Sequence, residues 1–221
     1  MHRIAIALVL ALMCVPLGAQ DARDPHQMHR LHSDPAAYIA ALEDPKRDAY
    51  QKPHEVMQAL AIREGEVIAD IGAGSGYFSL RLAHHVGTSG RVYAVDVSPE
   101  MVRHLHARVR DSTLLNLTPI LAALDDPLLP EPVDRVLFVN VWHHVNERPA
   151  YLARLEQLLK PGGQIVMIDF HKRELPVGPP AAMKIAREDL IREMEAGGFR
   201  AAREHDFLPY QYFVVFERAR R

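Results

Sequence analysis

The residues best suited to do chemistry in this chain are two carboxylates and three glycines. Asp70 ends a short apolar run, and Gly72, Gly74 and Gly76 follow it at every second position. Asp96 ends a second apolar run, twenty residues beyond Gly76. Glycines permit a sharp turn and a close backbone approach to a ligand, while a carboxylate can accept hydrogen bonds from the hydroxyls of a ribose. The spacing therefore indicates a site for a nucleotide-like ligand.

A strand must precede the glycines and a helix must follow them. Residues 67–71 have the length and apolar character of a buried parallel strand, and the sequence predicts a helix from Ser75 to about residue 86. The first N–H groups of such a helix would point at whatever occupies the turn. The usual dinucleotide fingerprint requires a glycine at position 77, where this chain has Tyr77. We therefore expect a nucleotide other than a dinucleotide.

With these motifs the sequence resembles the class I S-adenosylmethionine-dependent methyltransferases. Asp70-x-Gly72-x-Gly74-x-Gly76 corresponds to their first motif, and Asp96 to the acidic end of their second strand. The segment Leu-Lys-Pro-Gly-Gly at 159–163, before an apolar strand, is common in the branch that acts on small molecules. The likeness covers roughly residues 53–217.

The resemblance implies the cofactor, the reaction and the binding residues. The cofactor would be S-adenosyl-L-methionine, and its methyl group would pass to a small-molecule acceptor. The residues expected to bind the cofactor are Asp70, Gly72, Gly74, Gly76, Tyr77, Asp96, Val97, Asp125 and Asn140. The family often has Gly-Asp at the end of the third strand, where this chain has two alanines, so Asp125 or Asp126 is expected to replace that acid. The other interpretation of Asp126 is that it only begins a turn.

The catalytic candidates follow the fourth and fifth predicted strands. His143 and His144 come after the fourth strand, 133–139, and Asp169 ends the fifth, 164–168. Ligands bind outside the carboxyl ends of strands in open parallel sheets, which brings these side chains to the glycine turn. Either histidine could serve as a base for a hydroxyl or an acidic carbon, with Asp169 orienting it or contacting the acceptor. Alternatively, one histidine packs in the core and proximity alone supports the transfer.

The rest of the pattern predicts a doubly wound, Rossmann-like α/β fold with a mostly parallel, seven-stranded sheet. Strands at 200–205 and 212–217 are joined by a short link, which requires a C-terminal antiparallel hairpin. A plain dinucleotide domain would end in another parallel strand. The predicted helices, besides the one after the glycines, are 36–42, 53–60, 99–110, 148–159 and 187–196.

The first residues have the composition of an export signal. An apolar run over 4–17 follows a weakly basic start, and it is too short to span a bilayer comfortably. Cleavage after Ala19 would make the protein periplasmic or secreted, whereas an uncleaved segment would tether it to a membrane. We expect a signal peptide (1–19), an N-terminal extension with a short helix (20–52) and a methyltransferase domain (53–221). The single cysteine, Cys14, lies within the signal.

The amino-acid composition limits the kinds of partner that this chain is expected to bind. The chain is 48% hydrophobic and 24% charged with a net charge of −2, which suits one globular domain and gives no reason to expect nucleic acid or, after cleavage of the signal, stable membrane association. His26, His29 and His32 recur at three-residue spacing, and without a carboxylate pattern we expect no metal. The oligomeric state stays open. Two other functions remain: an exported, non-catalytic binding protein with this fold, and a nicotinamide-dependent oxidoreductase, which Tyr77 and the hairpin disfavour.

Overall fold

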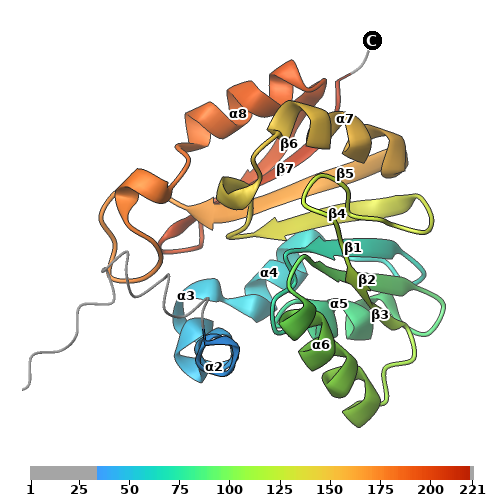
Figure 1. The fold of residues 1–221 in the computed structure, drawn as a ribbon. Helices are drawn as coiled ribbons and strands as arrows, with labels where there is room; N and C mark the ends of the chain where they lie inside the picture. Colours follow the sequence, from blue (N-terminus) through green and yellow to red (C-terminus); the bar gives the residue numbers. More distant parts are fainter. Residues whose placement is uncertain (1–33, 220–221) are drawn as a thin grey trace, which may run out of the picture.

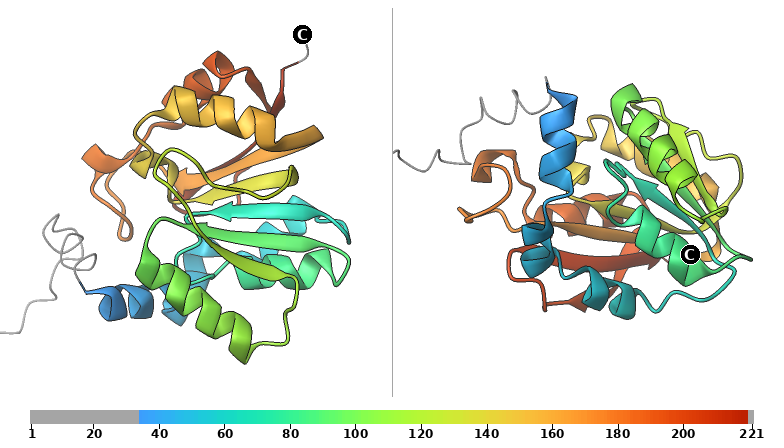
Figure 2. Two further views of the ribbon diagram at one scale, coloured as in Figure 1. Left: turned by 45° about the vertical axis from the view of Figure 1, so that its right-hand side comes forward. Right: turned by 90° about the horizontal axis from the view of Figure 1, so that it is seen from below.

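A seven-stranded sheet runs through the middle of the molecule, with helices on both faces (Figures 1 and 2). The computed structural model describes residues 34–219. The strand order is β3-β2-β1-β4-β5-β7-β6, so the order reverses between β1 and β4. The pairs among β1 to β5 are parallel, and β7 is antiparallel to both β5 and β6. The predicted Rossmann-like sheet with its C-terminal hairpin is confirmed.

The strands and helices have the following bounds. The strands are β1 (Val67–Ile71), β2 (Arg91–Asp96), β3 (Leu117–Leu121), β4 (Val133–Val139), β5 (Leu159–Phe170), β6 (Phe199–His205) and β7 (Gln211–Arg218). The α-helices are α2 (Pro35–Leu42), α3 (Asp48–Gln51), α4 (Pro53–Leu60), α5 (Ser79–Val86), α6 (Pro99–Asp111), α7 (Arg148–Leu158) and α8 (Arg187–Ala196). Short 3₁₀ turns are η1 (Pro45–Arg47), η2 (Trp142–His144) and η3 (Ala181–Met183).

Apolar side chains on the two faces of the sheet make two cores. Successive residues of a strand point to opposite faces, so Ile68 of β1 packs with α4, α5 and α6, while Ala69 packs with α7 and α8. Strands covered on both faces read as continuous apolar runs, which is why the central strands were predictable from sequence. Within the described residues, no helix is long and apolar enough to cross a bilayer.

Polar caps and prolines set where several helices begin. Asp34 accepts a hydrogen bond from the Ala37 amide (3.1 Å), and Ser98 Oγ accepts one from the Met101 amide (3.3 Å). Each cap is followed by a proline at the first helical position, which needs no amide donor there. The bounds of α4 and α8 are those predicted from the sequence.

The helix after the glycine turn begins later than predicted. The sequence places its start at Ser75, but α5 begins at Ser79. Gly76 has a φ of +83°, in the left-handed region, so a right-handed helix cannot run through it. Residues 75–78 therefore form turns instead of the first helical turn.

The Leu-Lys-Pro-Gly-Gly segment lies inside a strand. Val133 of β4 pairs with Leu159, but Arg135 pairs with Gln164, so the intervening residues bulge out of the ladder. The fifth strand is therefore longer than the predicted 164–168, with the turn as an interruption in it. The export signal, its cleavage site and His26, His29 and His32 lie outside the described residues, and the division into domains stays a prediction.

Candidate functional site

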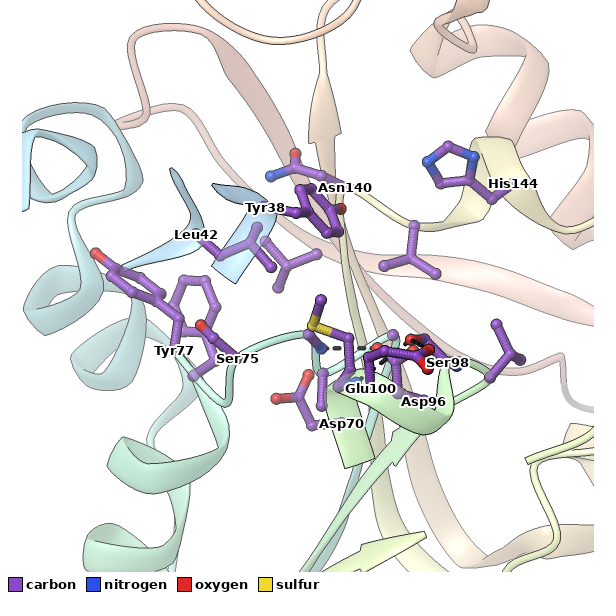
Figure 3. A pocket seen from close by; sticks show the side chains of 18 of the residues that line it. Tyr38, Leu42, Asp70, Ser75, Tyr77, Asp96, Ser98, Glu100, Asn140 and His144 are labelled. Carbon is purple, nitrogen blue, oxygen red and sulfur yellow. Dashed lines mark hydrogen bonds between the residues drawn. The ribbon is translucent and has the colours of Figure 1, made fainter. Parts of the chain in front are cut away.

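A cavity of about 400 Å³ lies at the carboxyl ends of β1, β2 and β4, where the strand order reverses. Its walls come from the glycine turn, the turn after β2, the end of β4 and the helix α2 (Figure 3). This volume suits a small organic ligand. The predicted site residues that line it are Asp70, Gly72, Gly74, Tyr77, Asp96, Val97, Asn140 and His144.

The glycine turn wraps around the end of β2. The amides of Gly72 and Ala73 both donate to Val95 O, at 2.8 and 2.9 Å. Gly72 and Gly74 have φ angles of +70° and +55°, which L side chains rarely adopt. A Cβ on Gly72 would lie 2.3 Å from Val141 Cγ2 on the cavity wall. The turn therefore requires glycine both for its backbone angles and for its approach to the wall.

Asp96 fixes the turn while lining the cavity. Its Oδ2 accepts a hydrogen bond from the Gly74 amide at 2.8 Å, and its Oδ1 accepts one from the Ser98 amide at 2.9 Å. Both carboxylate oxygens are therefore held by backbone amides of the two turns that border the cavity. The geometry allows the role predicted for Asp96, which stays a prediction.

Asp70 is a buried carboxyl at the end of β1. Its side chain accepts a hydrogen bond from Ser79 Oγ at 2.5 Å, and the Ser79 amide donates to it as well. The pKa of Asp70 is raised to about 7, chiefly by burial and also by the neighbouring charge of Asp96, while the Ser79 hydrogen bonds oppose the shift. Ser79, the first residue of α5, therefore donates to Asp70. The sequence predicts instead that the first amides of this helix point at a ligand in the glycine turn.

Tyr77 joins the N-terminal segment to the glycine turn. Its ring lies between the guanidinium groups of Arg47 and Arg81, 4.6 and 4.3 Å from the ring centroid, and its hydroxyl donates to Asp48. Arg47 and Asp48 belong to η1 and α3, whereas Tyr77 and Arg81 belong to the turn and α5. Tyr77 is thus a wall of the cavity and also an anchor for the elements that cover it.

His143 and Asp169 form a buried pair behind the cavity. His143 Nδ1 lies 3.0 Å from Asp169 Oδ2, and the two side chains are only 4% and 3% exposed. The His144 ring packs against that of His143, with centroids 4.1 Å apart, and His144 lines the cavity. Of these three predicted catalytic residues, His144 lines the cavity. His143 packs against His144, and Asp169 pairs with His143.

Two predicted cofactor residues do not line the cavity. A Cβ on Gly76 would lie 2.7 Å from Leu105 of α6, so Gly76 serves helix packing. Asp125 is exposed in the loop after β3, and its adenine contact stays a prediction. The neighbouring Asp126 accepts from the Leu128 amide at 2.9 Å and pairs with Arg154 at 3.2 Å, as a turn residue does.

Sequence reasoning missed the contribution of α2 to the cavity. Tyr38 and Leu42 of α2 line it, whereas Tyr50 of α3 and His54 of α4 do not. The sequence of α2, Pro-Ala-Ala-Tyr-Ile-Ala-Ala-Leu, is apolar all round, so no distinct stripe predicts its orientation, and none of its residues is buried in the structure. Ser75 and Glu100 also line the cavity. Ser75 follows Gly74 and Glu100 lies four residues after Asp96, so their closeness in sequence to these predicted residues could have identified them.

The comparisons with known proteins agree with this geometry. Residues 68–163 match the family model described as methyltransferase domain. The ubiquinone/menaquinone biosynthesis C-methyltransferase UbiE of Bordetella parapertussis is 30% identical over 119 residues, which are 54% of this chain and 46% of that protein. The uncharacterized methyltransferase GK2543 of Geobacillus kaustophilus is 24% identical over 181 residues, 81% of this chain and 76% of its own. The chain spans about half the length of the UbiE proteins it matches.

Solved structures resemble the whole described fold. A SAM-dependent methyltransferase from Aquifex aeolicus superposes with a TM-score of 0.77 and 28% identity, covering 83% of this chain and 97% of that one. Magnesium protoporphyrin IX methyltransferase from Synechocystis PCC 6803, solved with bound SAM, has a TM-score of 0.62 at 20% identity, over 85% and 91% of the two chains, and shows the fold alone. This chain therefore has the Rossmann-like methyltransferase fold, with a methyltransferase domain over residues 68–163.

Proposed function

We propose that this protein is an S-adenosyl-L-methionine-dependent methyltransferase acting on a small-molecule acceptor. The observation that carries the proposal is the cavity at the reversal of strand order, where the glycine turn and Asp96 meet. The methyltransferase-domain match and the Aquifex aeolicus structure support the same reaction. The UbiE relatives, whose name describes C-methylation in quinone biosynthesis, support a small organic acceptor.

The residues of the cavity fit that cofactor. Asp96 would accept from the ribose hydroxyls, and Leu42, Val97 and Met101 would pack against the adenine. Three carboxyl groups line the cavity, those of Asp70, Asp96 and Glu100. Arg47 lines it with a guanidinium group, so acidic groups outnumber this basic one. Such a balance favours a ligand with cationic groups. When bound, the cofactor supplies a methyl group carried on a positively charged sulfur.

Other polar groups of the chain would complete the cradle. Ser75 Oγ is buried at the cavity wall without a hydrogen-bond partner, which leaves it free to bond a ligand. Asn140 has a φ of +58°, and its side chain reaches the cavity from the end of β4 (Figure 3). A ligand bonded to these groups would lie between the ends of β1, β2 and β4, with its acceptor-facing end toward β4.

The acceptor would be activated at the β4 end of the cavity. His144 would take the proton from the attacking group, because it lines the cavity and imidazole titrates near neutral pH. The buried His143–Asp169 pair would fix the ring against which His144 packs. The remainder of the rate enhancement would come from holding the two reactants in line.

The test is transfer of labelled methyl from S-adenosylmethionine into extracts of the envelope and the cytoplasm of the native host, with identification of the labelled product. Titration calorimetry with S-adenosylmethionine and S-adenosylhomocysteine is run on the same protein. Binding heat together with a labelled small molecule supports the proposal. Binding without transfer would favour a non-catalytic binding protein with this fold, and no binding of either compound would remove the proposal.

We also infer that residues 1–19 direct export, giving a periplasmic or secreted protein. The support is the basic start, the apolar run and the small residues before Gln20. N-terminal sequencing of the protein recovered from cell fractions tests this inference. A chain beginning at Gln20 in the periplasm or medium supports it. An intact N-terminus in the membrane fraction would indicate the tethered form instead.

A further inference from the structure

Two buried glutamines hold most of the unpaired polar atoms of the described chain. In residues 34–219, five buried side-chain nitrogen or oxygen atoms have no hydrogen-bond partner, and three of them belong to Gln51 and Gln211. Both residues are 1% exposed. Neither end of the Gln51 amide is paired, and Oε1 of Gln211 is unpaired. Buried amides are nearly always hydrogen-bonded in folded proteins, so we expect these atoms to find partners beyond the described residues.

Gln211 adjoins the cavity through Asn140. Gln211 is the first residue of β7, and its Nε2 donates to Asn140 Oδ1 at 2.8 Å. Asn140 in turn lines the cavity. The free Oε1 of Gln211 shares one amide plane with this donating nitrogen, so it lies within a few ångströms of the cavity wall.

Gln51 lies in α3, a helix that reaches the same region through an aromatic ring. Tyr50, its neighbour in α3, has its ring centroid 6.2 Å from that of Phe170 and 6.2 Å from that of Tyr210. Phe170 pairs with Gln211 in the sheet, and Tyr210 precedes Gln211 in the chain. Residues from α3, the end of β5 and the start of β7 therefore meet beside the β4 end of the cavity.

This location is opposite to the ribose end of the proposed cofactor site. Asp96 ends β2, whereas Asn140 follows β4, and β5 and β7 lie beyond β4 in the sheet. A methyl acceptor must approach from the side that the nucleoside does not occupy. Gln211 and the helix α3 that carries Gln51 thus lie on the side from which the acceptor would approach, and this step rests on the proposed function.

We propose that Gln51 and Gln211 determine acceptor specificity by hydrogen-bonding a neutral hydroxyl or carbonyl group of an aromatic acceptor. A carboxamide both donates and accepts hydrogen bonds and carries no charge, so it matches such a group. The rings of Tyr50, Phe170 and Tyr210 supply the apolar surface that an aromatic ring prefers. A site that hydrogen-bonds a ligand group rejects the analogue without it, because the protein amides then stay unpaired.

Binding of small aromatic probes tests the assignment. The protein saturated with S-adenosylhomocysteine is titrated with phenol, toluene and benzoate, and the side-chain amide resonances are followed by ¹⁵N NMR. Phenol should shift the Gln51 amide signals, and toluene, which lacks the hydroxyl, should bind at least about tenfold more weakly. Benzoate should bind no better than toluene, because the glutamines offer no positive charge.

Variants separate specificity from structure. Gln51→Leu should weaken phenol binding about tenfold and leave the S-adenosylhomocysteine affinity unchanged. It should also raise the thermal midpoint of the ligand-free protein, because an unpaired buried amide is removed. Gln51→Met, which has the same length, is made in parallel in case the branched side chain does not fit. Gln164→Leu is the matched control, since Gln164 lies six residues before Phe170 in β5 and its amide already donates to Glu217.

The outcomes are distinct. If wild type binds S-adenosylhomocysteine but phenol moves no Gln51 signal, the amides are solvated by trapped water and the assignment is wrong. Preference for benzoate would also overturn it, and would point to Lys184, whose Nζ lies 5.7 Å from the Phe170 ring centroid. Equal phenol binding by both Gln51 variants and wild type would contradict it as well. Failure of S-adenosylhomocysteine to bind at all would instead refute the proposed function.

Discussion

Asp96 combines a structural and a binding role at the residue scale. Its two oxygens hold the Gly74 and Ser98 amides, and the same carboxylate faces the cavity. A hydrogen-bonded carboxylate is already oriented before a ligand arrives, so little ordering is required on binding. Its removal should therefore affect the ligand more than the fold.

Asp96→Ala should weaken binding of S-adenosylmethionine by more than tenfold, which corresponds to about 1.4 kcal/mol. The reason is loss of the acceptor for the ribose hydroxyls together with loss of the contact that holds Gly74. Titration calorimetry measures the affinity, with the exposed Asp111→Ala as the control. An unchanged affinity would remove Asp96 from the site.

Asp70 should make stability depend on pH. Its folded pKa is raised to about 7 from 3.8, so the folded state favours the neutral carboxyl. The stabilisation is complete below the unfolded pKa and is lost as the pH rises through 7. In denaturant titrations, wild type should lose stability relative to Asp70→Asn between about pH 4 and pH 7.5, by up to a few kcal/mol. A difference that does not vary over this range would show that Asp70 keeps an ordinary pKa.

The covering segment α2–η1–α3 shows what an element contributes. It lines the cavity through Tyr38, Leu42 and Arg47, yet α2 buries no residue in the core. Polar contacts hold it instead: Glu43 after α2 lies 2.7 Å from His104 Nε2 and 3.2 Å from Arg108 Nη1 of α6. Elements with few buried apolar contacts open at low free-energy cost. We therefore expect α2, the part of the segment without a buried residue, to open at a lower free-energy cost than the rest of the domain.

Glu43→Ala should increase hydrogen exchange in α2 severalfold without changing the midpoint of global unfolding. The reason is that it removes the contacts of Glu43 with His104 and Arg108 while leaving both cores intact. Exchange is measured by mass spectrometry, with the exposed Glu55→Ala on α4 as the matched control. Equal protection of α2 in the two variants would mean that Glu43 does not hold the segment.

At the scale of the whole molecule, the two ends of the sheet have different tasks. The carboxyl ends of the strands form the cavity, and a buried ion pair joins the amino ends of β1 and β4. Arg135 Nε lies 2.7 Å from Glu66 Oε2, the side chains are 10% and 4% exposed, and Arg135 Nη1 also donates to Leu60 O at 2.6 Å. Burial alone would raise the pKa of Glu66, but hydrogen bonds from Arg135 and Arg63 leave it lowered.

Arg135→Ala should destabilise the domain by about 3–5 kcal/mol, because it removes the buried counter-charge of Glu66 and leaves that carboxylate with the exposed Arg63 as its partner. Since the Glu66 pKa is lowered in the folded state, the stabilisation is present above pH 4.5 and is lost as the pH falls. Unfolding by urea measures both effects, and Arg192→Ala, from an exposed pair, should cost about 1 kcal/mol or less. A small effect of Arg135→Ala would assign the stability of this edge to apolar packing alone.

The sequence by itself determined the strands, most helix starts and the turn that a ligand would occupy. Apolar runs, Asp34 and Ser98 as caps, and glycines at alternate positions act through the local backbone, so they can be read without knowing which segments are neighbours. The same holds for the C-terminal hairpin, because a short link leaves two strands no parallel arrangement. Local physics was sufficient for these features.

Only the tertiary structure decided which side chains meet across the molecule. It placed Tyr38 on the cavity wall and Asp125 outside the cavity, paired Asp169 with His143, and brought the ring of Tyr50 near that of Tyr210 before β7. Each of these depends on contacts between segments far apart in the chain, which neither periodicity nor capping encodes. Burial then changed the chemistry, as at Asp70, because desolvation is a property of the packed molecule and not of any short stretch of sequence.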